Sequence, residues 1–136
     1  MSLGSAVGQF FIAAVLMAVL DLLWLGVVAN GFYERVLGDM LATQKNGWAA
    51  AVFYVIYVAG LVYLVVAPAV ADGSLGRAAV GGAVLGLLAY ATWNLTNLAV
   101  LSGFPARIVP VDMAWGTFLT AAVSTGTYLI WKLFTS

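Results

Sequence analysis

Two aspartates lie inside apolar stretches of this sequence, and a tryptophan follows each of them at the same spacing. Asp21 precedes Trp24 by three residues, and Asp112 precedes Trp115 by three residues. Residues three apart on a helix share a face, so each carboxylate and its indole are expected to point the same way. The indole N–H donates and the carboxylate accepts, so these groups can build a polar network away from water.

Further polar side chains occupy the two apolar stretches between these motifs. Tyr54 and Tyr57 are three apart and should share one helix face, as should Asn94 and Asn97, beside Trp93. Hydroxyl and amide groups are suitable hydrogen-bond partners for carboxylates. The pattern therefore predicts polar groups on every one of the apolar stretches.

The elements that carry these residues are expected to be membrane-spanning helices. The 136 residues are 65% hydrophobic and 7% charged, whereas a soluble domain carries about 25% charged residues. A span needs roughly 20 apolar residues of helix. The four spans that we expect are Ala6–Ala29, Trp48–Val70, Arg77–Leu101 and Val109–Leu133. The sequence thus predicts an all-α, antiparallel four-helix bundle, a single integral membrane domain over residues 1–136.

The segment Gly31–Leu41 differs from the spans because it is amphipathic. Phe32, Val36 and Met40 recur at helical spacing, and charged residues occupy the other face. This pattern is typical of a short helix in the membrane interface. It fits a lid packed on the end of the bundle as well as it fits a lipid sensor.

The depths of the polar residues are expected to agree. Measured at about 1.5 Å per residue from the side of the 31–41 segment, Asp21 lies roughly 12 Å deep and Asn94 roughly 10 Å. Tyr54 lies roughly 9 Å deep and Asp112 roughly 5 Å. All four spans therefore place polar side chains in the same half of the bilayer.

This convergence predicts a binding site for a small polar group, a cation or a proton. An ionisable residue inside a membrane is by default a candidate functional residue. Arg107, five residues before Asp112, is expected to supply a countercharge at the mouth of the site. The candidate ligand-binding residues are Asp21, Trp24, Tyr54, Tyr57, Trp93, Asn94, Asn97, Arg107, Asp112 and Trp115.

Composition excludes several classes of function. The chain has no Cys and no His, which excludes disulfides, thiol nucleophiles, iron–sulfur clusters and ordinary zinc sites. We therefore expect no metal centre and no cofactor. The formal net charge is zero, which makes nucleic acid a poor partner.

Three other interpretations stay open. The polar groups can serve only to hold the bundle together, at about 0.6 kcal/mol for each interhelical hydrogen bond. The chain can be a non-catalytic accessory subunit or assembly factor, in a homo-oligomer or a larger membrane complex, because it is small and lacks a soluble domain. An intramembrane enzyme acting on lipid ranks last, because no nucleophile with an adjacent base is legible.

Three stretches also resemble a known family. They are Asp21–Gly26, Tyr90–Ala99 and Val111–Thr117, and they are similar to a bacterial membrane family named only as domain of unknown function 2177. The resemblance covers nearly the whole chain and implies a four-helix protein of the bacterial inner membrane. Such proteins often carry Asp where this chain has Asn94, so a charge there is not expected to be essential. The resemblance implies no activity.

Overall fold

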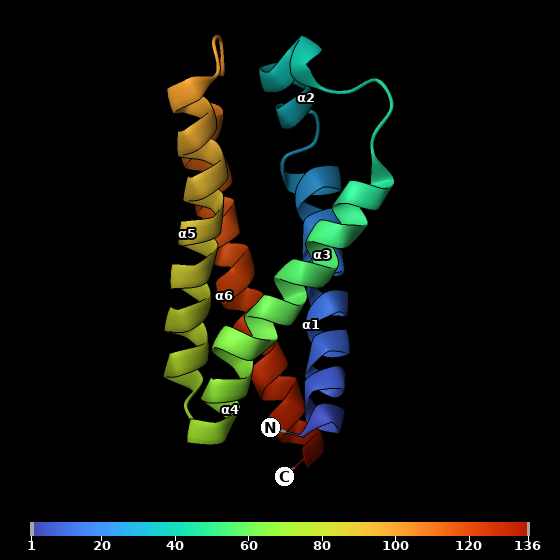
Figure 1. Ribbon diagram of the computed structural model, residues 1–136, viewed down its shortest axis with the longest axis vertical. Coiled ribbons are helices and arrows are strands. Elements are labelled where there is room, and N and C mark those ends of the chain that lie inside the picture. The colour runs from blue at the N-terminus through green and yellow to red at the C-terminus, as the bar shows by residue number, and fades with distance from the viewer. Residues whose placement is uncertain (1, 136) are drawn as a thin grey trace.

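Residues 2–135, which the computed structural model describes, contain four helices long and apolar enough to cross a membrane. The predicted all-α fold with four apolar helices is confirmed, and each expected span falls on one helix apart from Ala29 and Leu101. The first long helix consists of α1 (Leu3–Leu23) and η1 (Trp24–Val28) (Figure 1). The second consists of α3 (Gly47–Leu61), η3 (Val62–Val66) and α4 (Ala67–Asp72). The third is α5 (Leu75–Val100) and the fourth is α6 (Ile108–Thr135).

A wider, π-helical turn ends the first long helix, and another interrupts the second. In η1 the Ala29 N–H donates to the Trp24 carbonyl five residues earlier, at 2.7 Å. Such a turn re-aims the side chains around it and often occurs at functional sites. The other turn, η3, ends two residues before Pro68. The proline ring lacks an N–H and disrupts the regular hydrogen bonding of a helix.

The predicted short helix between the first two spans is present. It consists of α2 (Phe32–Leu37) followed by the tight turn η2 (Gly38–Met40). Gly31 and Gly38 bound α2 with φ of 77° and 54°, a backbone conformation that side chains with a Cβ rarely adopt. The apolar face of α2 packs on the start of α6 and the loop before it, through Phe32, Tyr33, Val36 and Leu37 against Phe104, Ile108 and Val109. The α2 segment therefore covers one end of the bundle, at the top in Figure 1.

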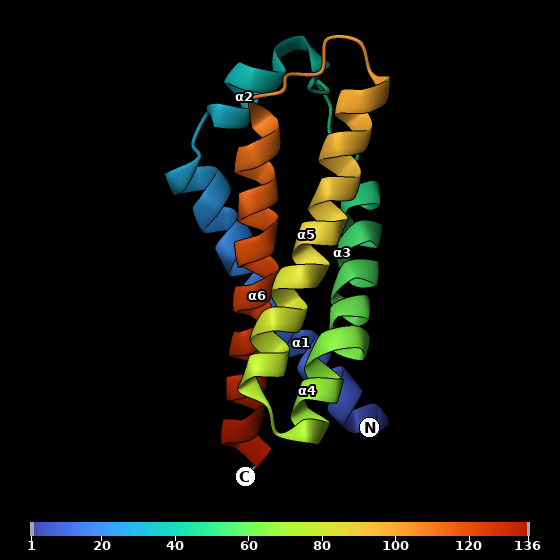
Figure 2. The same cartoon turned by 90° about the vertical axis from the view of Figure 1, so that its left-hand side faces the viewer.

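The helices α5 and α6 form a close antiparallel hairpin, visible side by side in Figure 2. Glycines allow this approach. A Cβ on Gly86 would lie 2.3 Å from the carbonyl oxygen of Gly116, and a Cβ on Gly116 would lie 2.0 Å from Cγ of Tyr90. Both distances are far below van der Waals contact, so the glycines are needed for the helices to pack and Tyr90 lies directly over Gly116.

The other two long helices pack on this hairpin unequally. The helix α1 contacts α6 along much of its length, and η3 and α4 contact α5. The first half of α3, in contrast, slants away from α5 towards the end covered by α2 (Figure 1). The main apolar core lies where the helices cross, with Met17, Leu61, Val66, Leu119 and Val123 fully buried.

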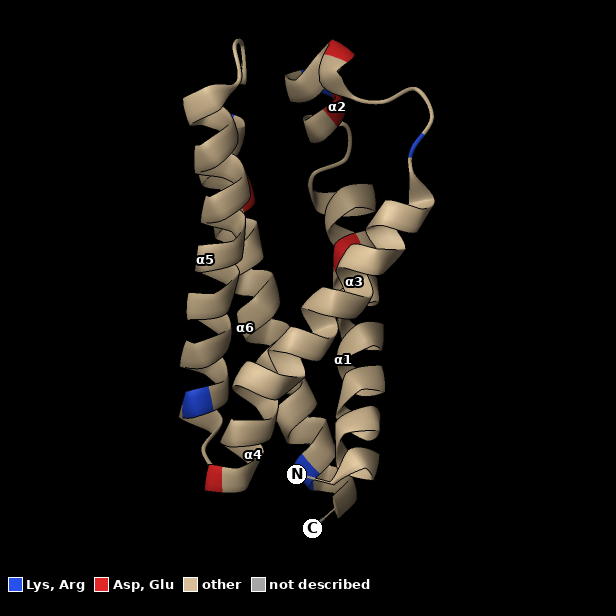
Figure 3. Ribbon diagram, in the orientation of Figure 1, with Lys and Arg blue, Asp and Glu red and all other residues tan. Residues whose placement is uncertain are grey.

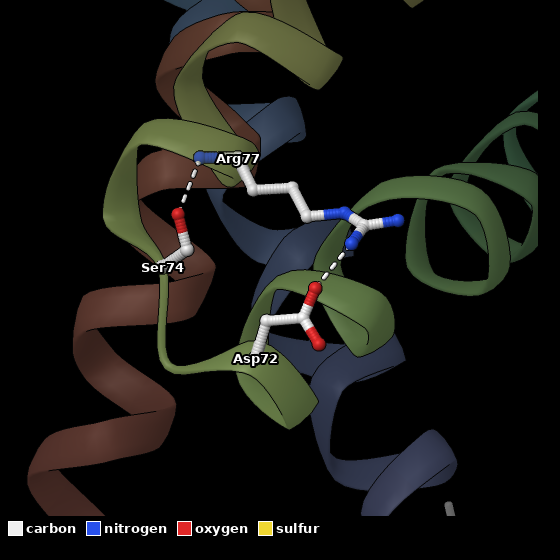
Figure 4. Close-up of polar contacts among 3 residues, drawn as sticks. All are labelled: Asp72, Ser74 and Arg77. Atoms are coloured by element: carbon white, nitrogen blue, oxygen red, sulfur yellow. Dashed lines mark hydrogen bonds and ion pairs between the residues drawn. The ribbon is translucent and has the colours of Figure 1, made fainter.

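Charged residues gather mainly at the two ends of the bundle (Figure 3). At the end away from α2, Arg77 at the start of α5 forms an ion pair with Asp72, and both side chains are about half exposed (Figure 4). The Ser74 hydroxyl oxygen accepts a hydrogen bond from the Arg77 N–H at 3.0 Å and so caps α5. This end is a conventional polar turn.

Candidate functional site

Asp112 is the most buried acid, with 8% of its surface exposed, four residues after α6 begins. The Tyr33 hydroxyl donates to its Oδ1 at 2.8 Å. The Asn94 amide donates to its Oδ2 at 2.8 Å. An ionised carboxylate is an acceptor only, and here both of its oxygens accept from neutral groups. Three elements, α2, α5 and α6, therefore meet at one carboxylate.

Asn94 is held in a single orientation. Its Nδ2 also donates to the backbone carbonyl of Tyr90 at 2.9 Å, so a flipped amide would bring two oxygens together. Asn94 has no exposed surface, and its Oδ1 has no hydrogen-bond partner among residues 2–135. Buried polar atoms are nearly always paired. The Asn94 Oδ1 atom beside Asp112 is therefore an acceptor that is available to a hydrogen-bond donor.

Asp21, on α1, accepts hydrogen bonds from two other donors. The Tyr54 hydroxyl, from α3, donates to Oδ2, and the Trp115 indole, from α6, donates to Oδ1 at 3.3 Å. Three of the four long helices are thus joined at this acid. A carboxylate far inside a span persists when it finds donors in this way.

The indoles of Trp24 and Trp115 connect the two acids through hydrogen bonds. Trp115 follows Asp112 in sequence but donates to Asp21. Trp24 follows Asp21 in sequence but donates at 2.9 Å to the Tyr33 hydroxyl, which in turn donates to Asp112. The two indoles stack on one another. Each indole therefore donates towards the acid of the other motif, directly for Asp21 and through Tyr33 for Asp112.

The structure brings most of the predicted residues together, but not all of them. Tyr57 is buried and its hydroxyl pairs with Thr120 Oγ1 at 2.7 Å. Trp93 packs edge-on against Phe104. The side chains of Asn97 and Arg107 make no hydrogen bond or ion pair with any residue in the described part of the chain, and Arg107 is exposed. The expected countercharge at Asp112 is not formed.

A pocket of about 360 Å³ lies against Asp112. Residues from four elements line it: Tyr33, Phe53, Ala89, Tyr90, Trp93 and Asp112. The walls are mostly aromatic, and Asp112 is the charged group among them. Such a pocket, apolar with one well-placed polar group, has the general character of a ligand site.

Sequence reasoning missed Tyr33, Phe53 and Tyr90 as members of this site. Tyr33 belongs to the apolar face of α2 and gives no sign of its partner, because contact with Asp112 spans 79 positions of sequence. Burial raises the pKa of the Tyr33 hydroxyl above its ordinary range, and the neighbouring Asp112 charge acts in the same direction. Tyr33 therefore remains a donor. A more informative signal in the sequence is the spacing of Tyr90 and Asn94, which share one face of α5.

The arrangement provides a fixed acceptor and no cation. In the described residues, the one ion pair is Arg77 with Asp72 at the opposite end of the bundle, and no group of three His, Cys, Asp or Glu side chains is close enough to hold a metal ion. A buried carboxylate without a positive partner is costly in an apolar medium. The site is therefore chemically suited to a proton, a cation or a donor group.

Comparison with known proteins agrees with this membrane architecture. The family model described as predicted membrane protein (DUF2177) matches residues 6–129. No curated protein matches the chain, and no solved structure does. The matched region runs from α1 to α6, includes Asp21 and Asp112, and covers most of each of the four long helices. The chain therefore belongs to the DUF2177 family of membrane proteins.

Proposed function

We propose that this membrane protein binds a small cation or a hydrogen-bond-donating group at Asp112, inside the pocket beside α2. The single observation that supports this most strongly is that Asp112 is buried, accepts hydrogen bonds from two neutral donors and meets the pocket without a cationic partner. A carboxylate at the centre of a span costs about 2.5–3.5 kcal/mol on insertion scales, and Asp112, buried nearer the end of α6, carries part of that cost. A positively charged or donating ligand would offset that cost.

The other polar residues have positioning roles in this proposal. Tyr33 and Asn94 hold the Asp112 carboxylate in one orientation. Asp21 with Tyr54 and Trp115 ties α1, α3 and α6 together. We place the site in a single transmembrane domain of a bacterial inner-membrane protein, on the basis of the helical spans and the sequence resemblance.

The test is a panel of added ligands, read as the shift of the thermal unfolding midpoint in lipid nanodiscs. The panel contains sodium, magnesium, ammonium, tetramethylammonium and glycerol, each over a range of concentrations. Binding to the folded state raises the midpoint by mass action. We expect a saturable rise with at least one cation or donor in the wild type, and none in Asp112→Asn.

Two further variants make the result interpretable. Asp72→Asn removes an exposed acid at the other end (Figure 4) and should respond like the wild type. Ala89 lines the pocket and makes none of the side-chain hydrogen bonds of Asp112. Ala89→Phe is therefore expected to fill the pocket and to lose the response, even if Asp112→Asn folds poorly. Equal responses in wild type, Asp112→Asn and Ala89→Phe, or no response to any compound, would overturn the proposal.

A further inference from the structure

Part of the wall of the pocket beside Asp112 comes from residues of α3 and α5 that are half exposed. Phe53 on α3 and Trp93 on α5 form part of its wall and are 47% and 48% exposed on the outside of the bundle. The first half of α3 slants away from α5 (Figure 1), whereas α5 packs against η3 and α4 further along. A ligand can therefore reach Asp112 between α3 and α5, without passing the end covered by α2.

The pocket lies at the depth of the boundary between headgroups and acyl chains. At about 1.5 Å per residue, Asp112 is about 6 Å from the start of α6, Phe53 about 9 Å from the start of α3, and Trp93 about 10 Å from the end of α5. The headgroup layer of a bilayer is about 5–8 Å thick on each side, so the polar head of an amphipathic molecule lies near this level. Molecules that already reside in the membrane would meet this opening first.

The walls have the chemistry of a cation site. Four aromatic rings surround the space, from Tyr33, Phe53, Tyr90 and Trp93, with the Asp112 carboxylate among them. The faces of aromatic rings carry negative partial charge and attract ammonium groups. A carboxylate supplies the full negative charge that the rings lack. An anionic head would be repelled, and a neutral hydroxyl would gain nothing from the rings.

We propose that the pocket takes the head of an amphiphile bearing an ammonium group, which enters from the bilayer between α3 and α5. The inference rests on the proposed function of Asp112 and adds the class of ligand and its route. The volume of about 360 Å³ accommodates the head and the first carbons of the chain. The remaining alkyl chain stays in lipid beyond Phe53 and Trp93.

The experiment measures tryptophan fluorescence in nanodiscs during titration with dodecyltrimethylammonium. Its permanent charge makes the head independent of pH, and Trp93 in the wall reports on occupancy. Three comparison compounds separate the contributions: tetramethylammonium lacks the chain, dodecanol lacks the charge and dodecyl sulfate reverses it. Asp72→Asn serves as the matched acid control. Ala89→Phe is expected to block the pocket without removing a hydrogen-bond partner of Asp112.

The expected result is a saturable change with dodecyltrimethylammonium alone among the amphiphiles, at a concentration lower by about tenfold or more than that for tetramethylammonium. The change should disappear in Asp112→Asn and Ala89→Phe and persist in Asp72→Asn. Trp93→Leu lacks the reporting indole, so its affinity is measured by the shift of the thermal unfolding midpoint. We expect the affinity to fall by about fivefold to thirtyfold, because one ring of the cation site is lost.

The other outcomes separate this inference from the function on which it rests. Equal affinity for tetramethylammonium and its dodecyl counterpart would overturn entry from lipid but leave cation binding at Asp112 intact. Saturable binding of dodecanol or dodecyl sulfate at the same site would overturn recognition of the ammonium charge. Unchanged dodecyltrimethylammonium binding in Asp112→Asn and Ala89→Phe would overturn both proposals. The absence of any cation binding would overturn this inference, and would overturn the proposed function as well if no donor group binds either.

Discussion

The indole rings of Trp24 and Trp115 lie parallel, with 4.5 Å between their centroids and 5° between their planes. The stack joins the two Asp-x-x-Trp motifs, and each indole donates towards the acid of the other motif, directly for Asp21 and through Tyr33 for Asp112. The two acids are therefore parts of one connected network. A substitution at one acid should therefore affect the other acid.

The stack itself predicts an energetic coupling between the two indoles. Trp24→Phe and Trp115→Phe should each destabilise the protein by about 1–2 kcal/mol, since each removes a donor and part of the stack. The double variant should lose less than the sum, with a coupling of about 0.5–1.5 kcal/mol. Reversible unfolding in mixed micelles measures all three. Trp48→Phe is the control, because Trp48 is 74% exposed; strict additivity would contradict the coupling.

Tyr33 is expected to hold α2 on the end of the bundle. Tyr33→Phe keeps the ring and removes the hydroxyl that accepts from Trp24 and donates to Asp112. We expect faster amide hydrogen exchange in Phe32–Leu37 than in the wild type, by about fivefold to tenfold for a loss of about 1 kcal/mol. Tyr63→Phe is the control, because Tyr63 is 71% exposed on η3. Unchanged exchange in α2 would show that apolar packing alone holds it.

The hydroxyl of Tyr33 should resist ionisation in alkaline solution. Burial and the Asp112 charge raise its pKa above the ordinary value of about 10. A raised pKa in the folded state means that the stabilisation is complete below the ordinary pKa and is lost as the pH rises towards the folded one. Tyrosinate absorbance, as the difference between wild type and Tyr33→Phe, should show no titration of this group near pH 10. A step at that pH would mean that Tyr33 is free of Asp112.

The close approach of α5 and α6 predicts a sharp difference between two glycines. Gly116→Ala places a methyl group inside the Tyr90 ring position, so Tyr90 must move and the helices must separate. We expect a destabilisation of about 1–3 kcal/mol from overpacking. Gly60→Ala, with nothing within 4 Å of its Cβ, should be neutral or slightly stabilising because alanine favours helix. Equal unfolding midpoints for the two variants would contradict the packing.

The fold follows from the sequence because hydrophobic length and breaks between spans are local signals. Asp72-Gly73-Ser74 and the Pro105 region end helices for reasons that act within a few residues. The polar residues could be assigned to one half of the bundle by counting along each helix. Asp21, Asn94 and Asp112 were therefore legible as candidates from the sequence.

The hydrogen-bond partners of those residues could not be predicted in the same way. The rotation of one helix relative to another decides which donor meets which acid, and the π-helical turn at Trp24 changes that rotation. Tyr33 reaches Asp112 only because α2 folds back over the start of α6. The crossed indoles and the pocket depend on tertiary packing, which spacing along one helix does not encode.

The most direct test of Asp112 as the binding group is carbon-13 NMR of aspartate side-chain carboxyls in nanodiscs. Substitution of Asp112 by Asn and of Asp72 by Asn assigns their two resonances. On addition of dodecyltrimethylammonium, the Asp112 carboxyl resonance should shift and saturate while that of Asp72 stays in place. A stationary Asp112 resonance at saturating ligand, or a shift confined to the other aspartates, would contradict the account.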